Sequence, residues 1–227
     1  MTKRLAKKFF EAYNPIEKIT ECPDGRVGVR KLLDIYAKAA VNLYGIILRK
    51  ELAEIFSMQN AEQTTSEEIF SLLLPLVYKN EWYCFYKDYI VHSDMIENFD
   101  YAEYLIQGQS GKPRYVPERD EFPEYQDEYY EDKKQKSYWD KIFSLVEKEW
   151  PDNEQKYDFF HALKDMAQMG EGNLKIGQLQ DKYNIVFEND EKAKQFVNLL
   201  MEAFNNTRIW INKGYSPDEM YNARNGE

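Results

Sequence analysis

One aromatic and β-branched stretch interrupts a chain that otherwise has the apolar spacing of helices. Residues 82–86 read Trp-Tyr-Cys-Phe-Tyr and residues 89–92 read Tyr-Ile-Val-His, with only Lys87 and Asp88 between them. These residue types favour strands, and a two-residue connection between two strands is typical of a β-hairpin. We therefore predict one hairpin in a mainly α-helical protein.

Apolar residues at helical spacing precede the hairpin. Stripes within residues 5–13, 32–44, 48–56 and 69–76 predict four helices. Thr65-Ser-Glu-Glu68 predicts a capping box for the fourth helix. Pro75 should end or kink that helix, because proline lacks the amide proton of an interior turn. Helices followed by a hairpin are the order of a winged helix-turn-helix, so we predict a winged-helix-like module over residues 1–106.

A stretch without apolar residues, 107–113, follows this module. It combines two glycines, a serine and a proline, and predicts a linker over residues 107–117. Beyond it, residues 118–227 should form a second, helical module. Ser216-Pro-Asp-Glu219 has the residues that begin a short last helix. The predicted fold class is thus mainly α, with a winged-helix-like N-terminal module, one hairpin and a C-terminal helical module.

Acidic residues concentrate just after the predicted linker. Residues 118–132 hold eight acids and one arginine, so they carry seven of the ten excess negative charges of the chain. One interpretation is a docking surface for a basic partner, with Tyr125, Glu128 and Tyr129 in contact with it. The other, which we favour, is a helix with exposed acids and inward-packing aromatic residues, namely Phe122, Tyr125, Tyr129 and Tyr130.

The charge pattern disfavours binding to nucleic acid. A helix that reads DNA presents Arg, Lys, Asn or Gln on its first turns, whereas the candidate recognition helix presents Ser66, Glu67, Glu68 and Ser71. The net charge of −10 also opposes contact with phosphate backbones. The first 31 residues nevertheless have a net charge of +4, so DNA remains an alternative partner.

Common catalytic and metal-binding motifs do not occur in the sequence. His92 and His161 stand apart, and there is no CxxC, HExxH, GxSxG or glycine-rich phosphate loop. Asp152, Glu154 and Lys156 contain the letters of a nuclease PD…ExK site. Such a site needs its halves on neighbouring strands, and here they lie two residues apart at a helix start. We therefore expect a non-enzymatic protein without cofactor or metal.

The sequence also bears on the cellular compartment. Cys22 and Cys84 could pair, but a single bridge adds little to a chain able to form its own core, so we expect reduced thiols. No apolar stretch approaches the roughly 20 residues needed to cross a bilayer, and the basic N-terminus lacks the apolar run of a signal peptide. We expect a cytoplasmic protein with no membrane contact.

Three stretches of the chain resemble a known group of proteins. They are Val41–Ile47 with Glu51–Phe56, then Tyr115–Phe122, and Asn205–Met220 with its NNTRIW and GYSPDEM letters. They resemble uncharacterised proteins of low-GC Gram-positive bacteria, some of which carry a C-terminal SEC-C metal-binding motif. This chain stops at Glu227 without the cysteines of that motif, so zinc binding is not carried over. The resemblance implies a bacterial cytosolic protein and supplies no mechanism.

The last of these stretches holds a polar and aromatic group of side chains. One interpretation makes Arg208 and Trp210 a pocket for an anionic or planar ligand. The other, which we favour, has the polar side chains bonded to carbonyls at a helix end, with Trp210 anchoring the last helix. The function that we expect is that of a protein-interaction or adaptor protein whose partner is another protein. The alternative is a winged-helix regulator associated with nucleic acid.

Overall fold

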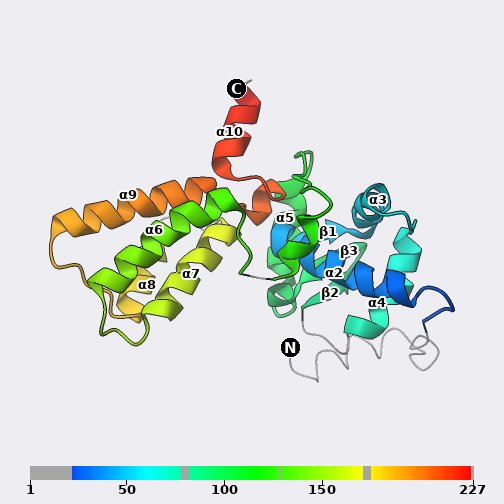
Figure 1. The fold of residues 1–227 in the computed structure, drawn as a ribbon, viewed down its shortest axis with the longest axis horizontal. Coiled ribbons are helices and arrows are strands. Elements are labelled where there is room, and N and C mark those ends of the chain that lie inside the picture. The colour runs from blue at the N-terminus through cyan, green and yellow to red at the C-terminus, as the bar shows by residue number, and fades with distance from the viewer. Residues whose placement is uncertain (1–21, 78–81, 128, 171–174, 226–227) are drawn as a thin grey trace. The chain divides into compact units, whose positions relative to one another are not determined.

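The chain folds into two compact units. The computed structural model describes residues 22–77, 82–127, 129–170 and 175–225 (Figure 1). Unit 1 comprises residues 1–110 and 116–130, and unit 2 comprises residues 111–115 and 131–227, so the chain passes between the units more than once. The helix predicted within residues 5–13 lies outside the described residues.

Unit 1 has the element order of a winged helix. Its first six described elements are α2 (Val27–Tyr44), β1 (Ile46–Leu48), α3 (Arg49–Gln59), α4 (Ser66–Val77), β2 (Tyr83–Tyr86) and β3 (Tyr89–His92). The strands form an antiparallel sheet in the order β1-β3-β2, with Ile47 opposite Ile90 and Cys84 opposite Val91. The mainly α fold and the hairpin are confirmed. Strand β1 was not predicted, because three apolar residues between two helices carry no alternation.

Local backbone geometry explains where these elements end. Gly45 has a φ of 73°, a left-handed conformation that glycine adopts without strain, and its amide donates to the carbonyl of Val41. The hairpin turns at Lys87, which has a φ of 53°. Strand β1 can therefore follow α2 directly and pair with β3, and the core of unit 1 forms between α2 and the sheet.

The start and end of α4 differ from the sequence prediction. The amide of Glu68 donates to Oγ1 of Thr65, but the Glu68 carboxylate binds Arg26 instead of turning back to the cap, so only half of the capping box forms. The helix also continues past Pro75 to Val77. Proline there removes a single hydrogen bond near the helix end, and the buried side chains of this stretch hold it in place.

The boundary between the units differs from the predicted linker at 107–117. Helix α5 (Phe99–Gln109), which follows the 3-10 turn η2 (Ser93–Met95), continues through Gly108. Residues 116–130, which contain the 3-10 helix η3 (Phe122–Gln126), belong to unit 1 rather than to the C-terminal module. They do so because η3 packs against α2 and buries two aromatic side chains there.

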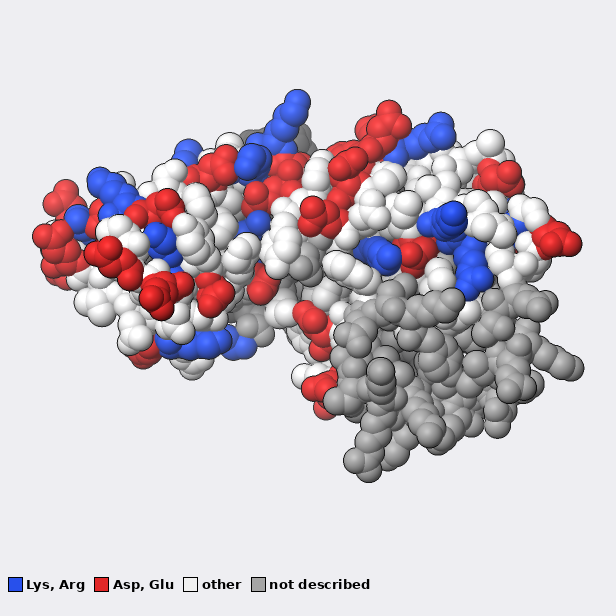
Figure 2. All heavy atoms as spheres, turned by 60° about the horizontal axis from the view of Figure 1, so that its bottom comes forward, with Lys and Arg blue, Asp and Glu red and all other residues white. Residues whose placement is uncertain are grey.

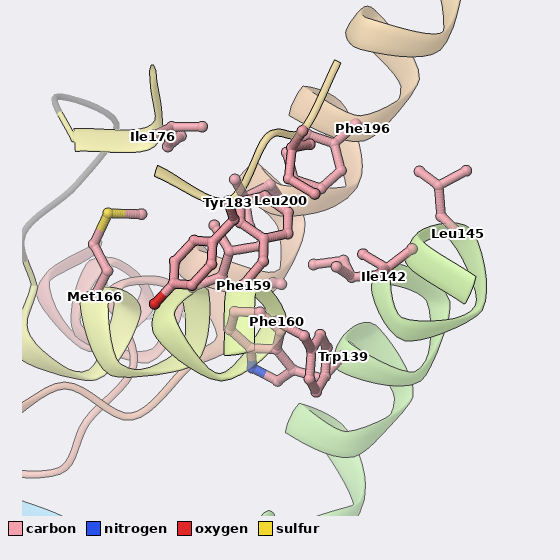
Figure 3. Packing of buried hydrophobic residues seen from close by; sticks show 14 of the residues in the cluster. Trp139, Ile142, Leu145, Phe159, Phe160, Met166, Ile176, Tyr183, Phe196 and Leu200 are labelled. Atoms are coloured by element: carbon pink, nitrogen blue, oxygen red, sulfur yellow. The ribbon is translucent and has the colours of Figure 1, made fainter. Parts of the chain in front are cut away.

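Unit 2 is helical around an aromatic core. Its elements are α6 (Lys133–Glu149), α7 (Lys156–Met169), α8 (Ile176–Lys182), α9 (Asp190–Asn206), η5 (Trp210–Asn212) and α10 (Pro217–Asn225). Figure 3 shows Trp139 of α6, Phe159 of α7 and Phe196 of α9 among the buried side chains of this core. The Ser216–Glu219 capping box forms in both directions, at 2.9 and 3.2 Å. In the described part of the chain, no helix is both long and apolar enough to span a bilayer.

Candidate functional site

The acidic segment, residues 118–130, is folded onto α2. Phe122 is fully buried, and its ring stacks on that of Tyr36 with centroids 4.9 Å apart. Tyr125 is also buried. The side-chain amide of Asn42 donates to the main-chain carbonyl of Tyr125 at 2.9 Å. Sequence reasoning missed Asn42, although a single amide inside an apolar helical stripe is a signal for such a contact.

Several described acids of this segment are exposed. Glu118, Asp120 and Glu124 are exposed and form no ion pair with any residue that the structure describes. Tyr129 is 56% exposed, whereas Tyr130 is half-buried against Tyr125. Phe122 and Tyr125 therefore pack inward as the favoured interpretation predicts, whereas Tyr129 faces solvent against it. The buried Tyr125 is not available to a partner, and docking of a basic partner stays a prediction. Glu128 lies outside the described residues.

The acidic segment begins beside the end of α3. The side-chain amide of Gln59 donates to the carbonyl of Pro117 at 2.8 Å, and its oxygen accepts from the Tyr36 hydroxyl at 2.9 Å. Burial raises the pKa of Tyr36, Arg119 opposes that rise, and the charge of Asp120 adds to it. The segment is thus held both by its own buried rings and by the helix-turn-helix.

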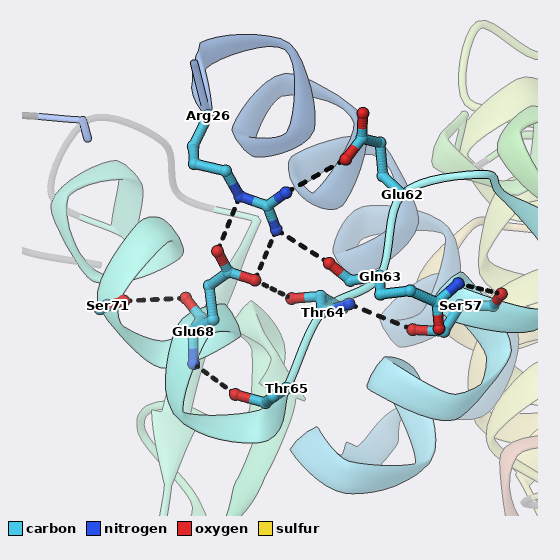
Figure 4. A network of polar contacts seen from close by, with 8 residues as sticks. All are labelled: Arg26, Ser57, Glu62, Gln63, Thr64, Thr65, Glu68 and Ser71. Atoms are coloured by element: carbon cyan, nitrogen blue, oxygen red, sulfur yellow. Dashed lines mark hydrogen bonds and ion pairs between the residues drawn. The ribbon is translucent and has the colours of Figure 1, made fainter. Parts of the chain in front are cut away.

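The turn between α3 and α4 is held by one guanidinium (Figure 4). Nε and Nη2 of Arg26 donate to the two carboxylate oxygens of Glu68, at 2.7 and 2.5 Å. Nη2 also donates to the carbonyl of Gln63 at 2.9 Å, and Nη1 donates to Glu62 at 3.3 Å. The residue just before α2 therefore fixes the turn and the first turn of the candidate recognition helix. In the sequence, Arg26 is only one of the basic residues behind the net charge of +4 of the first 31 residues.

Two cations at or beside the hairpin tip are likewise paired with carboxylates. Arg49 donates to Asp88 at 2.6 Å and lies 5.0 Å from the ring of Phe70 on α4. Lys87, at the hairpin tip, pairs with Glu103 of α5. Its hydrogen bond to that carboxylate raises the pKa of Lys87 and lowers the pKa of Glu103. These cations are therefore already engaged within unit 1.

The helix-turn-helix and wing carry net negative charge. Residues 46–77 and 82–92 hold three Lys or Arg and six Asp or Glu. Glu67 is exposed at the start of α4, and its hydrogen bond from Ser66 lowers its pKa. On the face shown in Figure 2, the basic side chains among the described residues stand in small groups between acidic ones. Such a surface gives a phosphate backbone little to bind.

Arg208 and Trp210 are both buried in unit 2. Arg208 donates to Asp132 at 3.0 Å, to Glu219 at 2.9 Å and to the carbonyl of Gly214 at 3.0 Å. Its guanidinium carbon lies 3.5 Å from the ring centroid of Tyr115. The guanidinium therefore bonds one carbonyl, as the favoured interpretation predicts, and also two carboxylates that it did not predict.

An open depression of about 600 Å³ lies where α6 ends and α7 begins. Its lining includes Asp152 and Glu154, the acids of the nuclease-like pattern. Nζ of Lys156 instead donates to the carbonyl of Pro151 and pairs with Glu147. Within the described ranges, no group of His, Cys, Asp or Glu side chains is placed to hold a metal ion.

Comparisons with known proteins add no further information on the site. No protein-family model, curated protein or solved structure matches the chain. The resemblance to the Gram-positive bacterial proteins therefore stays a prediction, and functional inference depends on the geometry described above.

Proposed function

We propose that this chain is a non-enzymatic interaction or adaptor protein that binds a basic segment of another protein through its acidic segment. The observation that carries the proposal is the combination of buried anchors and exposed acids. Phe122 and Tyr125 fix the backbone on α2, while Glu118, Asp120 and Glu124 project into solvent.

The anchored backbone favours binding for an energetic reason. A flexible acidic tail loses conformational freedom when it binds, which reduces the affinity. Here the backbone between Phe122 and Gln126 is already ordered by η3 and by Asn42. The carboxylates then supply electrostatic steering toward a basic partner, and Tyr129 supplies contact area. Free Cys22 and Cys84 fit the reducing cytoplasm, the location that we propose.

A binding assay with a matched control tests the proposal. The probe is a fluorescently labelled oligoarginine peptide, followed by anisotropy at low ionic strength. Neutralising the exposed acids of the segment, as E118Q/D120N/E124Q/D127N, should weaken binding about tenfold or more. The control D152N/E154Q/D158N/D181N changes the net charge equally, at exposed acids of unit 2, and should change binding by less than about twofold.

The two variants together separate local docking from general attraction. An equal loss of affinity in both would show that the peptide responds only to net charge, and would overturn the proposal. Failure of the unmodified protein to bind the peptide would also overturn it.

The second candidate function is a winged-helix regulator associated with nucleic acid. The observation that favours it is the β2–β3 hairpin, which follows α3 and α4 and pairs with β1. The pairing of Arg26, Arg49 and Lys87 with carboxylates opposes it. Anisotropy of a labelled random-sequence DNA duplex at low salt decides between the two candidates. Tight DNA binding that is lost in R49A/K87A would favour this candidate over the first.

A further inference from the structure

The acidic segment is a loop that leaves unit 2 and returns to it. The chain leaves unit 2 after Tyr115, follows residues 116–130 on unit 1, and re-enters unit 2 at Glu131. Arg208 contacts the chain on both sides of this excursion. Its guanidinium stacks on Tyr115 at 3.5 Å, and its Nε donates to Oδ2 of Asp132 at 3.0 Å.

The first end of the loop is fixed around Tyr115. The Tyr115 amide donates to the carbonyl of Lys213 at 3.1 Å, and its ring meets the edge of Tyr215 at 5.7 Å between centroids. Nζ of Lys112 donates to the carbonyl of Ile211 at 2.8 Å. The stacked guanidinium of Arg208 covers this ring, so the residue preceding the loop is held on several sides.

The second end of the loop is fixed by one carboxylate with two functions. Oδ1 of Asp132 accepts from the amides of Lys134 and Gln135, both at 2.9 Å, and so caps α6. Oδ2 of the same carboxylate accepts from Arg208. Because one side chain contacts both Tyr115 and Asp132, the two ends of the loop are held together inside unit 2.

Arg208 is itself held on its far side by α10. Its Nη1 donates to Glu219, which also accepts from the amide of Ser216 in the capping box. The Arg208 side chain is only 9% exposed. Hydrogen bonds between ionised groups are stronger away from water, so the guanidinium has little freedom to leave this position.

We propose that Arg208 is the positioning residue of the acidic segment, a clamp that joins the two ends of the loop and limits the conformations of residues 116–130. Fixed ends reduce the number of states open to a loop, so the segment keeps the form in which its acids are presented. This inference rests on the proposed function only in one respect, namely that the positioned segment binds a basic partner. The clamp itself is measured without a partner.

Hydrogen–deuterium exchange of the full chain tests the clamp. R208Q removes the guanidinium that contacts Tyr115 and Asp132, together with its bonds to Gly214 and Glu219. Y115L keeps those bonds and removes the ring beneath the guanidinium, together with its contact to Tyr215. In each variant the amides of residues 116–130 should exchange about tenfold faster than in the unmodified protein. The control E219A removes the contact to α10 and leaves Tyr115 and Asp132 in place. It should speed exchange in α10 and leave residues 116–130 within about twofold.

Exchange in α7 and α9 reports whether unit 2 remains folded in each variant. If R208Q unfolds the core of unit 2, the test of the clamp depends on Y115L alone. Unchanged exchange of residues 116–130 in Y115L, or in a folded R208Q, would overturn the clamp and leave Arg208 as an anchor for α10. If the variants exchange faster while the unmodified protein does not bind oligoarginine, the clamp is supported and the proposed function is overturned.

Discussion

The ring of Phe122 lies nearly parallel to the ring of Tyr36, with centroids 4.9 Å apart and an angle of 18° between the planes. Both rings are almost completely buried. Tyr36 belongs to α2, which precedes Phe122 by more than 75 residues in the chain. An aromatic residue of the acidic segment is therefore part of the core of the winged-helix unit, and loss of that contact should destabilise the unit.

F122A should lower the free energy of unfolding of unit 1 by about 3–5 kcal/mol, the cost of removing a buried phenyl ring and leaving a cavity. Urea denaturation measures the change. Y129A serves as the control from the same segment, because Tyr129 is mostly exposed, and should change stability by less than about 0.5 kcal/mol. Equal effects of the two substitutions would mean that the segment is not anchored through Phe122.

The hairpin and the longer helices could be predicted because their signals are local. Residues 82–92 combine strand-forming side chains with a two-residue turn, and both strands appear where expected. Strand β1 could not be predicted in this way. Its three residues become a strand only by pairing with β3, a contact across more than 40 positions.

The conformation of the acidic segment could not be predicted from helical spacing either. A regular helix would have placed Tyr125 and Tyr129 on one face, but η3 ends at Gln126, so Tyr125 is buried and Tyr129 is exposed. The clamp and the turn network depend on distant partners. Arg26 and Glu68 are 42 positions apart, and Arg208 and Asp132 are 76 positions apart. No local pattern specifies such pairs.

A buried hydrogen bond in unit 2 gives another prediction. The indole N–H of Trp139 donates to Oγ1 of Thr207 at 3.0 Å, and that hydroxyl donates to the carbonyl of Ala203 at 2.7 Å. T207V keeps the shape but leaves the indole without its acceptor, and should lower stability by about 1–3 kcal/mol. T207S keeps the hydroxyl and should retain more of the stability. Thermal unfolding followed by tryptophan fluorescence compares the two, and a T207V protein as stable as T207S would contradict the expectation.

The Arg26 network should stabilise the helix-turn-helix measurably. R26M keeps much of the aliphatic stem and removes the bonds to Glu68, Glu62 and Gln63, so it should lower the free energy of unfolding by about 1–2 kcal/mol. Added salt should reduce the stability difference between R26M and the unmodified protein, because the Arg26–Glu68 ion pair is only partly buried. K50M breaks the exposed Lys50–Glu54 pair and should change stability by less than about 0.5 kcal/mol. Chemical denaturation at low and high salt compares the variants, and an R26M protein no less stable than K50M would show that the network contributes little.

Cys84 should resist thiol reagents in the folded protein. Burial in the sheet raises the pKa of the Cys84 thiol from its ordinary value of 9.0 to about 12, so the thiol stays protonated at pH 8. A C22S variant should therefore react with a disulfide reagent only after denaturant is added. A rapid reaction of native C22S would show that Cys84 is accessible as a thiolate.

The same thiol should make stability depend on alkaline pH. Above pH 9 the unfolded chain can ionise Cys84 while the folded chain cannot, so stability present below pH 9 is lost as the pH rises toward 12. The loss should approach about 1.4 kcal/mol per pH unit. Urea unfolding of the unmodified protein and of C84A over this range isolates the contribution, because other titrating groups are common to both. A stability difference between the two proteins that stays constant with pH would show that the folded state does not suppress ionisation of Cys84.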